Sequence, residues 1–91
     1  MSFKILYHEA VVSQDIPRIS KEWRIKIKRG IEDKLISHPE VFGKPLRNSL
    51  KGYRKLRVGD YRIVFRIEEN IIKVLAIKHR SVVYETTKKR V

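Results

Sequence analysis

Cysteine is absent from this sequence of 91 residues, which excludes disulfide bonds and thiolate metal ligands. The three histidines, His8, His38 and His79, lie far apart in the chain and lack the paired spacing of a metal site. We therefore expect neither a metal nor another cofactor. Long hydrophobic runs are also lacking, because the apolar run at residues 3–7 is short and contains Lys4. The sequence thus predicts a cytoplasmic protein without a membrane partner.

Acidic residues are scarce relative to basic ones. The sequence has 10 Asp and Glu against 22 Lys and Arg, which gives a formal net charge of +12. Such a charge opposes compaction unless a polyanion or an acidic partner compensates it, and nucleic acid is the commonest polyanion for a small basic domain. The alternative interpretation is that the charge serves solubility or reflects a genome rich in lysine.

The first half of the chain predicts one strand followed by helices. Residues 3–7 alternate as in a strand with one apolar face, and residues 9–15 can form a short helix that Pro17 interrupts. A longer helix is expected to begin after Ser20, a typical N-cap, and to end near Ser37, before Pro39. Its apolar residues recur at every fourth position: Trp23, Ile27, Ile31 and Leu35.

The second half predicts a loop, three strands and a short helix. Residues 40–52 lack periodicity and predict a loop, after which residues 53–58, 61–68 and 71–79 form an antiparallel meander. Residues 81–90 predict a terminal helix that frays over its last three residues. The expected fold is a single α+β domain over residues 1–91 with the order β-α-α-β-β-β and a short C-terminal helix. Its two N-terminal helices pack on one face of an antiparallel sheet.

The opposite face of this sheet is expected to be basic. Within residues 61–68 the apolar side chains alternate with Arg62 and Arg66, which therefore point away from the helices. Lys55 and Arg57 in the preceding strand share that face. A chain this short offers no second helical layer, so we expect the face to be open. Residues 71–79 are apolar on both parities, and periodicity does not assign their faces.

Two clusters of residues are candidates for phosphate binding and acid–base chemistry. The first joins Arg54, Lys55 and Arg57 with Arg62 in the next strand, and can bind phosphate. Like charges nearby disfavour protonation of a lysine, which makes Lys55 a candidate general base. The alternative is a solvated basic strand face, the usual meaning of a charge run.

The second cluster lies at the end of the last strand. Lys78, His79 and Arg80 place positive charge there, and Tyr84 adds an aromatic ring one helical turn later. Such a group can hold a phosphate and stack on an unpaired base. Alternatively, Tyr84 packs the helix on the sheet and His79 hydrogen-bonds the backbone at a strand end.

The sequence resembles the RelE/ParE toxin superfamily over nearly its whole length. The likeness rests on the element order and on two motifs, Gly59-Asp60-Tyr61-Arg62 before an apolar strand and His79-Arg80-Ser81-Val82-Val83-Tyr84 at the end of the last strand. Together, in this order and spacing, they are fairly specific to the superfamily.

The resemblance implies a toxin that cleaves messenger RNA in the ribosomal A site without a metal, by attack of the RNA 2′-hydroxyl on the adjacent phosphorus. By motif position, Lys55 matches a base, Arg62 the arginine on the scissile phosphate, and Arg80 an arginine that assists the transition state. Tyr84 matches the tyrosine that orients or stacks the reacting base, and His79 is a secondary acid or base candidate. Further RNA contacts are expected from Lys51, Arg54, Arg57 and Lys78.

The sequence departs from the RelE pattern at one position. Tyr53 stands where the family places a second catalytic lysine, and Arg54 or Arg57 would have to supply the missing charge, although arginine is a poor base. Two other functions therefore stay open: a ParE-like poison of DNA gyrase without nuclease activity, and a non-catalytic RNA-binding module. The expected partners are an acidic, RelB-like antitoxin and the ribosome with its message.

Overall fold

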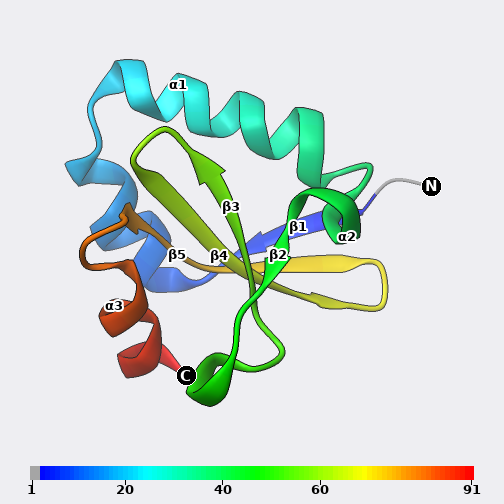
Figure 1. Cartoon of the computed structure of the whole chain (residues 1–91). Coiled ribbons are helices and arrows are strands. Elements are labelled where there is room, and N and C mark those ends of the chain that lie inside the picture. The colour runs from blue at the N-terminus through cyan, green and yellow to red at the C-terminus, as the bar shows by residue number, and fades with distance from the viewer. Residues whose placement is uncertain (1–2) are drawn as a thin grey trace.

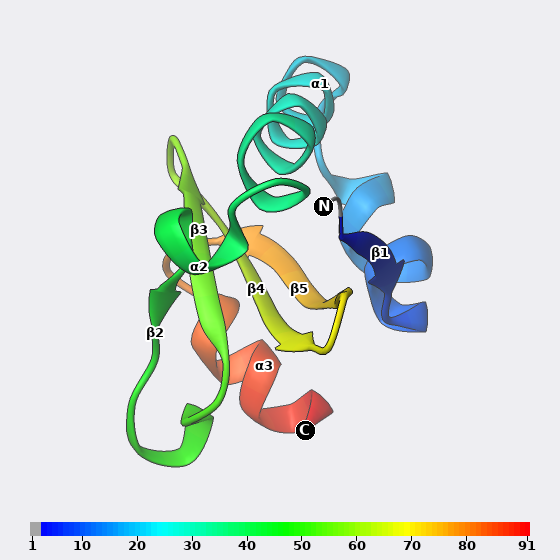
Figure 2. The same cartoon turned by 90° about the vertical axis from the view of Figure 1, so that its right-hand side faces the viewer.

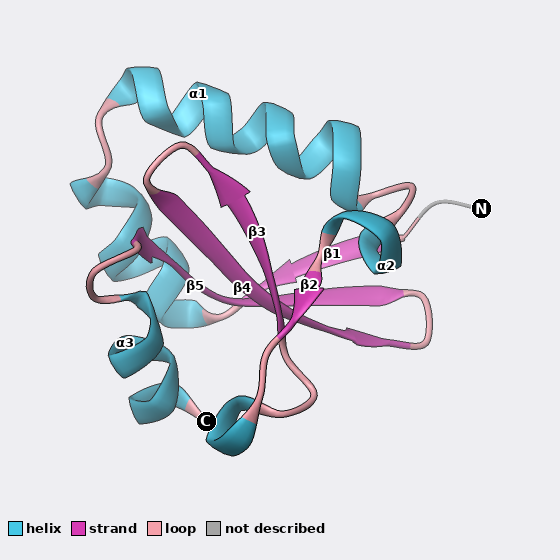
Figure 3. Cartoon of the chain, viewed as in Figure 1, coloured by secondary structure: helices cyan, strands magenta, loops and turns pink. Residues whose placement is uncertain are grey.

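The computed structural model describes residues 3–91, which form a five-stranded sheet with helices on both faces (Figures 1 and 3). The strand order is β1-β5-β4-β3-β2. The strands are β1 (Lys4–Tyr7), β2 (Lys44–Pro45), β3 (Arg54–Val58), β4 (Tyr61–Glu68) and β5 (Ile71–His79). The expected α+β class and the order of the main elements are confirmed.

The long helix lies where the four-residue spacing of apolar side chains predicts it. Helix α1 (Lys21–Gly30) continues through the wider π-type turn η3 (Ile31–Leu35). The Ser20 hydroxyl accepts a hydrogen bond from the Trp23 N–H at 3.4 Å, which confirms the N-cap. The buried residues Ile27, Ile31 and Leu35 join the main core between helix and sheet. Two short turns, η1 (Val11–Asp15) and η2 (Ile16–Arg18), precede α1. None of the helices in residues 3–91 has the length and apolar character needed to span a bilayer.

The sheet is mixed, and the expectation of a purely antiparallel sheet is wrong for its first strand. Strand β1 runs parallel to β5, with Lys4 paired with Ile71 and Tyr7 with Val74. The remaining pairs, β2 with β3, β3 with β4 and β4 with β5, are antiparallel. Side-chain alternation is the same for either direction of pairing, so the sequence of β1 gives no sign of its parallel neighbour.

A β-bulge explains why β5 is apolar on both parities. Val64 is paired with Ala76 and Phe65 with Val74, so Leu75 is an extra residue in β5. The bulge reverses the alternation of side chains, and Val74 and Ile77 both reach the main core although they are three positions apart.

The second face of the sheet is covered in part, which corrects the expectation of an open face. Helix α3 (Val83–Arg90) lies on the side of the sheet opposite α1 (Figure 2). Val83 packs with Val64 and Ala76 in a second, smaller core, to which Tyr53 and Tyr84 contribute from its border. The eight residues of α3 are thus enough for a small second layer, because it packs on β4 and β5.

The expected loop at residues 40–52 contains three short elements. They are helix α2 (Pro39–Phe42), strand β2, and the 3-10 turn η4 (Asn48–Leu50). These elements are too short to show a period, so sequence patterning predicts none of them. The Arg54 guanidinium donates to the carbonyl of Gly43 at 2.9 Å and thereby fixes the connection between α2 and β2. As a result, Phe42 is held at the edge of β3.

The C-terminal helix is anchored at its last residue, so the expectation of a frayed end is wrong. Arg90 donates two hydrogen bonds to the carboxylate of Asp15, at 2.7 and 2.8 Å, and a third to the carbonyl of Leu75 in the bulge, at 3.0 Å. Asp15 also accepts from the Ile77 N–H at 2.9 Å and lies 3.2 Å from Lys78 Nζ. We call Asp15, Ile77, Lys78 and Arg90 the Asp15 clamp. It joins α3 to the N-terminal half of the chain.

The turn between β3 and β4 leads to a first prediction, on stability. Gly59 has φ +59°, and a Cβ there would lie 2.3 Å from the Trp23 ring. Gly59→Ala should therefore lower the free energy of unfolding by about 2 kcal/mol, from backbone strain and displacement of the ring together. The control is Gly52→Ala, where φ is +95° and no atom lies within 4 Å of the added carbon, so that only strain of about 1 kcal/mol is expected. Equal losses in urea unfolding would contradict this account.

Candidate functional site

A basic groove runs along the edge of β3 and encloses about 240 Å³. Strands β3 and β4 contribute three cations to it, β2 and η3 contribute one each, and α2 contributes an aromatic ring. We define the basic groove by these polar and aromatic side chains, which lie around Leu56: Lys34, Phe42, Lys44, Lys55, Arg57 and Arg62. Within residues 3–91, no carboxylate lines this groove.

Like charges face each other across the strands of this groove. Lys44 is paired directly with Lys55, and Arg57 with Arg62. Cross-strand pairs of like charge destabilise a sheet, so the free protein retains repulsion that a bound polyanion would relieve. The electrostatics of the groove therefore favour a ligand with closely spaced negative charges.

Lys55 lies between this groove and helix α3. Its side chain is half-buried, and its Nζ lies 5.8 Å from the centroid of the Tyr84 ring, within the range of a cation–π contact. Tyr84 reaches this position because Val83, the residue before it, is buried in the second core. The structure thus brings together Lys55 and Tyr84, which lie 29 positions apart in the sequence.

Arg62 is held in place by the turn that precedes its strand. Its guanidinium donates to the carbonyls of Gly59 at 2.9 Å and Tyr61 at 3.0 Å. Arg80 contacts the same turn: its N–H donates to the Asp60 carbonyl at 2.8 Å and its Nε lies 3.9 Å from the Asp60 carboxylate. Both arginines therefore contact the turn between β3 and β4: Arg62 lines the groove, and the Arg80 side chain is exposed.

His79 lies away from the groove, on the face that packs against the helices. It is paired with Tyr61, and the two rings meet edge to face at 6.3 Å. Its Nδ1 lies 2.8 Å from the Ser81 hydroxyl, in a hydrogen bond at the strand end. The structure does not bring His79 to Lys55 and Tyr84.

Of the four further RNA contacts expected from the sequence, only Arg57 lines the basic groove. Arg54 shares the parity of Leu56, so its side chain points to the opposite face of β3 and bonds Gly43. Lys78 has its charge next to Asp15 and is 19% exposed. Lys51 is exposed in the turn before β3, outside the groove.

Three groove residues were missed by the analysis of the sequence: Lys34, Phe42 and Lys44. Lys34 lies on the exposed side of η3, and the other two residues flank Gly43 in the segment expected to be a loop. In the sequence, the signal for these residues is a phenylalanine close to lysines in a segment without hydrophobic periodicity. The fold alone places them against β3.

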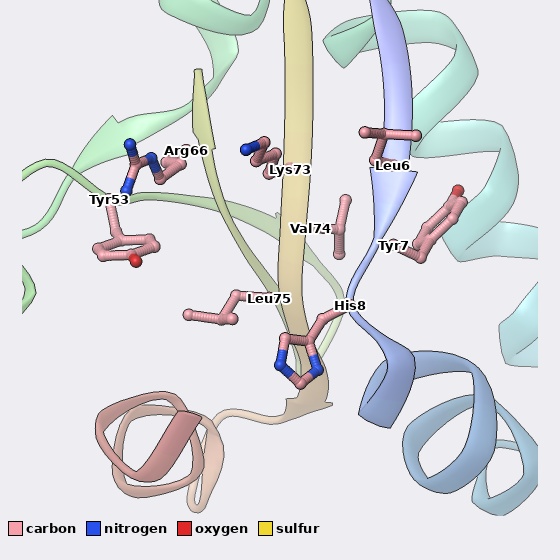
Figure 4. Close-up of a pocket in the computed structure, with 8 residues that line it drawn as sticks. All are labelled: Leu6, Tyr7, His8, Tyr53, Arg66, Lys73, Val74 and Leu75. Atoms are coloured by element: carbon pink, nitrogen blue, oxygen red, sulfur yellow. The ribbon is translucent and has the colours of Figure 1, made fainter. Parts of the chain in front are cut away.

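Tyr53 lies in a second hollow, on the same face of the sheet beside α3. Figure 4 shows its ring next to Arg66, with β5 and then β1 on the other side. The ring centroid is 6.0 Å from the Arg66 guanidinium, and the neighbouring Tyr53 phenol and then the charge of Glu68 raise the pKa of Arg66. The residue that departs from the RelE pattern therefore contacts Arg66 and is absent from the lining of the basic groove.

The arrangement can bind and polarise a phosphodiester. Arg62 presents a guanidinium fixed by two carbonyls, Lys55 an amine, and Tyr84 a ring for stacking next to that amine. Residues 3–91 contain no group of three or more His, Asp or Glu side chains placed to hold a metal.

The comparisons with known proteins agree on one family. Residues 8–84 match the family described as the ParE toxin of the type II toxin-antitoxin system parDE. The toxin RelE of Mycobacterium tuberculosis is 31% identical, over 86% of this chain and 86% of that protein.

Two solved structures are similar in fold. The first is the toxin-antitoxin complex RelBE2 from Mycobacterium tuberculosis, with a TM-score of 0.80 and 23% identity over 88% of this chain and 100% of the matched chain. The second is the RelB-RelE antitoxin-toxin complex from Methanococcus jannaschii, with a TM-score of 0.69 and 23% identity over 88% of this chain and 95% of the matched chain.

Proposed function

We propose that this chain, which belongs to the RelE/ParE superfamily of type II toxin–antitoxin toxins, is a ribosome-dependent endoribonuclease that cleaves messenger RNA in the A site and so inhibits translation. The observation that supports this function best is the contact between Lys55 and Tyr84 beside the fixed guanidinium of Arg62. A base, a phosphate clamp and a stacking ring are the groups that cleavage of a single RNA strand requires.

The proposed reaction is an internal transesterification. The 2′-oxygen attacks the adjacent phosphorus, the bond from phosphorus to the 5′-oxygen breaks, and the products end in a 2′,3′-cyclic phosphate and a 5′-hydroxyl. Lys55 accepts the 2′-hydroxyl proton, and Arg62 binds the oxygens on which negative charge develops. Tyr84 stacks on the base and holds the attacking oxygen in line with the leaving oxygen.

The other two candidates have supporting roles in this proposal. Arg80 is exposed at the turn that also holds Arg62, from which it can reach a non-bridging oxygen when the message is bound. His79 lies on the other face, so it does not act at the scissile phosphate unless the strand end rearranges. The leaving 5′-oxygen then takes its proton from water, which closes the proton balance of the reaction.

We propose an acidic antitoxin of the RelB type as the partner of this chain. The two similar structures described above are complexes of a toxin with its antitoxin. The net charge of +12 favours an acidic partner, and a segment laid over the basic groove would exclude RNA from it.

A second candidate function follows from the family match itself. The matching family is described by its ParE members. A protein that poisons gyrase by binding it would not need the contact between Lys55 and Tyr84. Two assays with the purified protein separate the alternatives: translation of a defined message, and supercoiling by DNA gyrase.

The nuclease is expected to stop translation, to leave new RNA ends and to have no effect on supercoiling. A gyrase poison gives the reverse result. A non-catalytic RNA-binding module stops translation without producing new ends.

The chemistry leads to a second prediction. A message with a single 2′-deoxy nucleotide immediately 5′ of the cut site should resist cleavage at that bond, because the attacking oxygen is missing. Cleavage at neighbouring bonds should continue, which serves as the internal control. Gel analysis of the end-labelled message would detect the loss, and an undiminished cut at the deoxy position would refute the proposed nucleophile.

A further inference from the structure

Among the residues that the structure describes, Phe42 is the one aromatic side chain in the lining of the basic groove, and its ring is partly exposed. It is 43% exposed, at the end of the four-residue helix α2, and belongs to neither core cluster. Lys34 Nζ lies 5.7 Å from its ring centroid, and the His38 ring meets it edge to face at 6.5 Å. These contacts orient the ring beside the cations of the groove.

The cations nearest to Phe42 have no acidic partner in the described chain. Within residues 3–91, Lys34, Lys44 and Arg57 form no ion pair within 4.0 Å. Other lysines of the same chain do find carboxylates: Lys26 pairs with Glu22 at 3.3 Å, and Lys78 with Asp15 at 3.2 Å. The charge on this side of the groove is therefore available for an external anion.

We propose that this side of the basic groove is a subsite for a second nucleotide, in which Phe42 stacks on the base and Lys34 and Lys44 bind the adjoining phosphate. The inference rests on the proposed function and extends the RNA contact beyond the scissile phosphate. Aromatic rings next to a track of cations are the usual means by which proteins hold single-stranded nucleic acid. A stacked base would cover the part of the Phe42 ring that is exposed in the free protein.

The position of the subsite fits a nucleotide next to the one that is cut. Lys44 is paired with Lys55, and paired residues of neighbouring antiparallel strands lie only about 5 Å apart. A phosphate on Lys44 is thus close to a phosphate on Lys55 and Arg62. One strand of RNA can therefore pass from Tyr84 over Lys55 to Phe42, with one phosphate on Lys55 and Arg62 and the next on Lys34 and Lys44.

The composition of the groove favours RNA over a protein segment. Five cations and one ring line it, and an apolar segment would have to remove all five charges from water in order to reach Phe42. A stretch of acidic residues would satisfy the charges but would leave the ring without a stacking partner. A nucleotide supplies both the anion and the ring.

The test measures binding of a single-stranded RNA hexanucleotide by fluorescence anisotropy. A 2′-O-methyl backbone prevents cleavage during the measurement. Phe42→Leu, which keeps an apolar side chain but loses the aromatic face, should weaken binding about tenfold, and Phe42→Trp should retain it. Lys44→Gln should weaken binding and reduce the slope of log affinity against log salt by about one. The matched controls, Ile25→Ala and Lys21→Gln on the exposed side of α1, should leave binding by the groove nearly unchanged.

A set of hexanucleotides with one abasic position each locates the stacked base. At one position the abasic oligonucleotide should bind wild type and Phe42→Leu equally, because the lost base is the one that contacts the ring. At the other positions the difference between the two proteins should persist.

Several outcomes would overturn the subsite. Wild type that binds no hexanucleotide at low salt, or Phe42→Leu that binds every hexanucleotide as wild type does, excludes stacking at Phe42. Weakened binding of an acidic antitoxin peptide by Phe42→Leu, without any effect on RNA, would assign the ring to a protein interface.

The failure of the subsite and that of the proposed function are distinguishable in the same set of proteins. Ribosome-dependent cleavage together with an inert Phe42 refutes the subsite alone. Binding that depends on Phe42 in a protein without cleavage refutes the nuclease and leaves an RNA-binding site in place.

Discussion

Replacing Arg62 by alanine is expected to slow cleavage of a ribosome-bound message by about a hundredfold to a thousandfold. That is the usual loss when one fixed donor to the developing charge is removed. Two carbonyls hold the Arg62 guanidinium before RNA binds, so little reorganisation is needed during the reaction. The measurement is the single-turnover rate, because substrate binding by the remaining cations then does not obscure the chemical step.

Arg66→Ala is the matched control for this variant. Arg66 lies on the same strand four positions later, is exposed, and contacts Glu68 and the Tyr53 ring. It is absent from the lining of the basic groove, so its loss should change the rate by less than about threefold, through net charge alone. Similar losses in the two variants would show that overall charge is what matters and would contradict a specific role for Arg62.

Replacing Asp15 by alanine is expected to lower the free energy of unfolding by about 3–5 kcal/mol, the usual cost of removing one partner from a buried ion pair. The Asp15 side chain is fully buried and Arg90 is 10% exposed. The change would leave the Arg90 guanidinium, the Lys78 ammonium and the Ile77 N–H without their acceptor. Since small domains unfold with about 5–15 kcal/mol, the loss is a large part of the total.

Urea unfolding measures this loss, with Glu22→Ala as the control. Glu22 forms an exposed pair with Lys26 at 3.3 Å, and exposed pairs contribute less than about 1 kcal/mol. If Asp15→Ala costs no more than Glu22→Ala, the clamp does not stabilise the fold. A comparable urea slope in both variants would confirm that the difference lies in the native state.

The Asp15 clamp should also make stability depend on acid pH. Burial raises the pKa of Asp15 most strongly, but hydrogen bonds from Arg90, the Ile77 N–H and Lys78 together outweigh it and place the pKa below the ordinary 3.8. The stability contributed by the ionised carboxylate is therefore complete above 3.8 and is lost as the pH falls through the lower value of the folded state. The Asp15→Asn variant should be less stable than wild type near neutral pH. In urea unfolding at a series of acid pH values, its free energy of unfolding should fall less with decreasing pH than that of wild type.

The long helix and strand β4 could be predicted because their sequence signals are local. The N-cap Ser20 determines where α1 begins. The apolar residues at every fourth position determine which side of the helix is buried. The alternation in β4 likewise assigned Ile63 and Arg62 to opposite faces. In both cases the hydrophobic pattern and the backbone geometry have the same period.

The features that escaped prediction depend on contacts between distant residues. The bulge at Leu75 shifts the alternation of side chains in β5 by one residue. The Leu75 carbonyl accepts a hydrogen bond from Arg90. Asp15 and Arg90 lie 75 positions apart, so neither residue indicates the other in the sequence. The anchored terminus and the cover on the second face both follow from that pair.

The candidate site was predictable to the extent that it lies on one strand face. Lys55 and Arg57 alternate with core residues of β3, and Arg62 lies on the same face of β4. The same alternation places Arg54 on the other face, which the charge run as a whole concealed. Phe42 and Lys44 reach the groove only through the path of the segment from α2 to β2, which has no periodic signal.

A primer-extension map of a translated message, with ribosomes present and absent, tests the nuclease most directly when wild type is compared with the double variant Arg62→Ala with Tyr84→Ala. We predict cuts in the A-site codon that require ribosomes and wild-type protein, and that disappear with the double variant. An intact message beside a wild type that still arrests growth would contradict the nuclease and direct attention to gyrase.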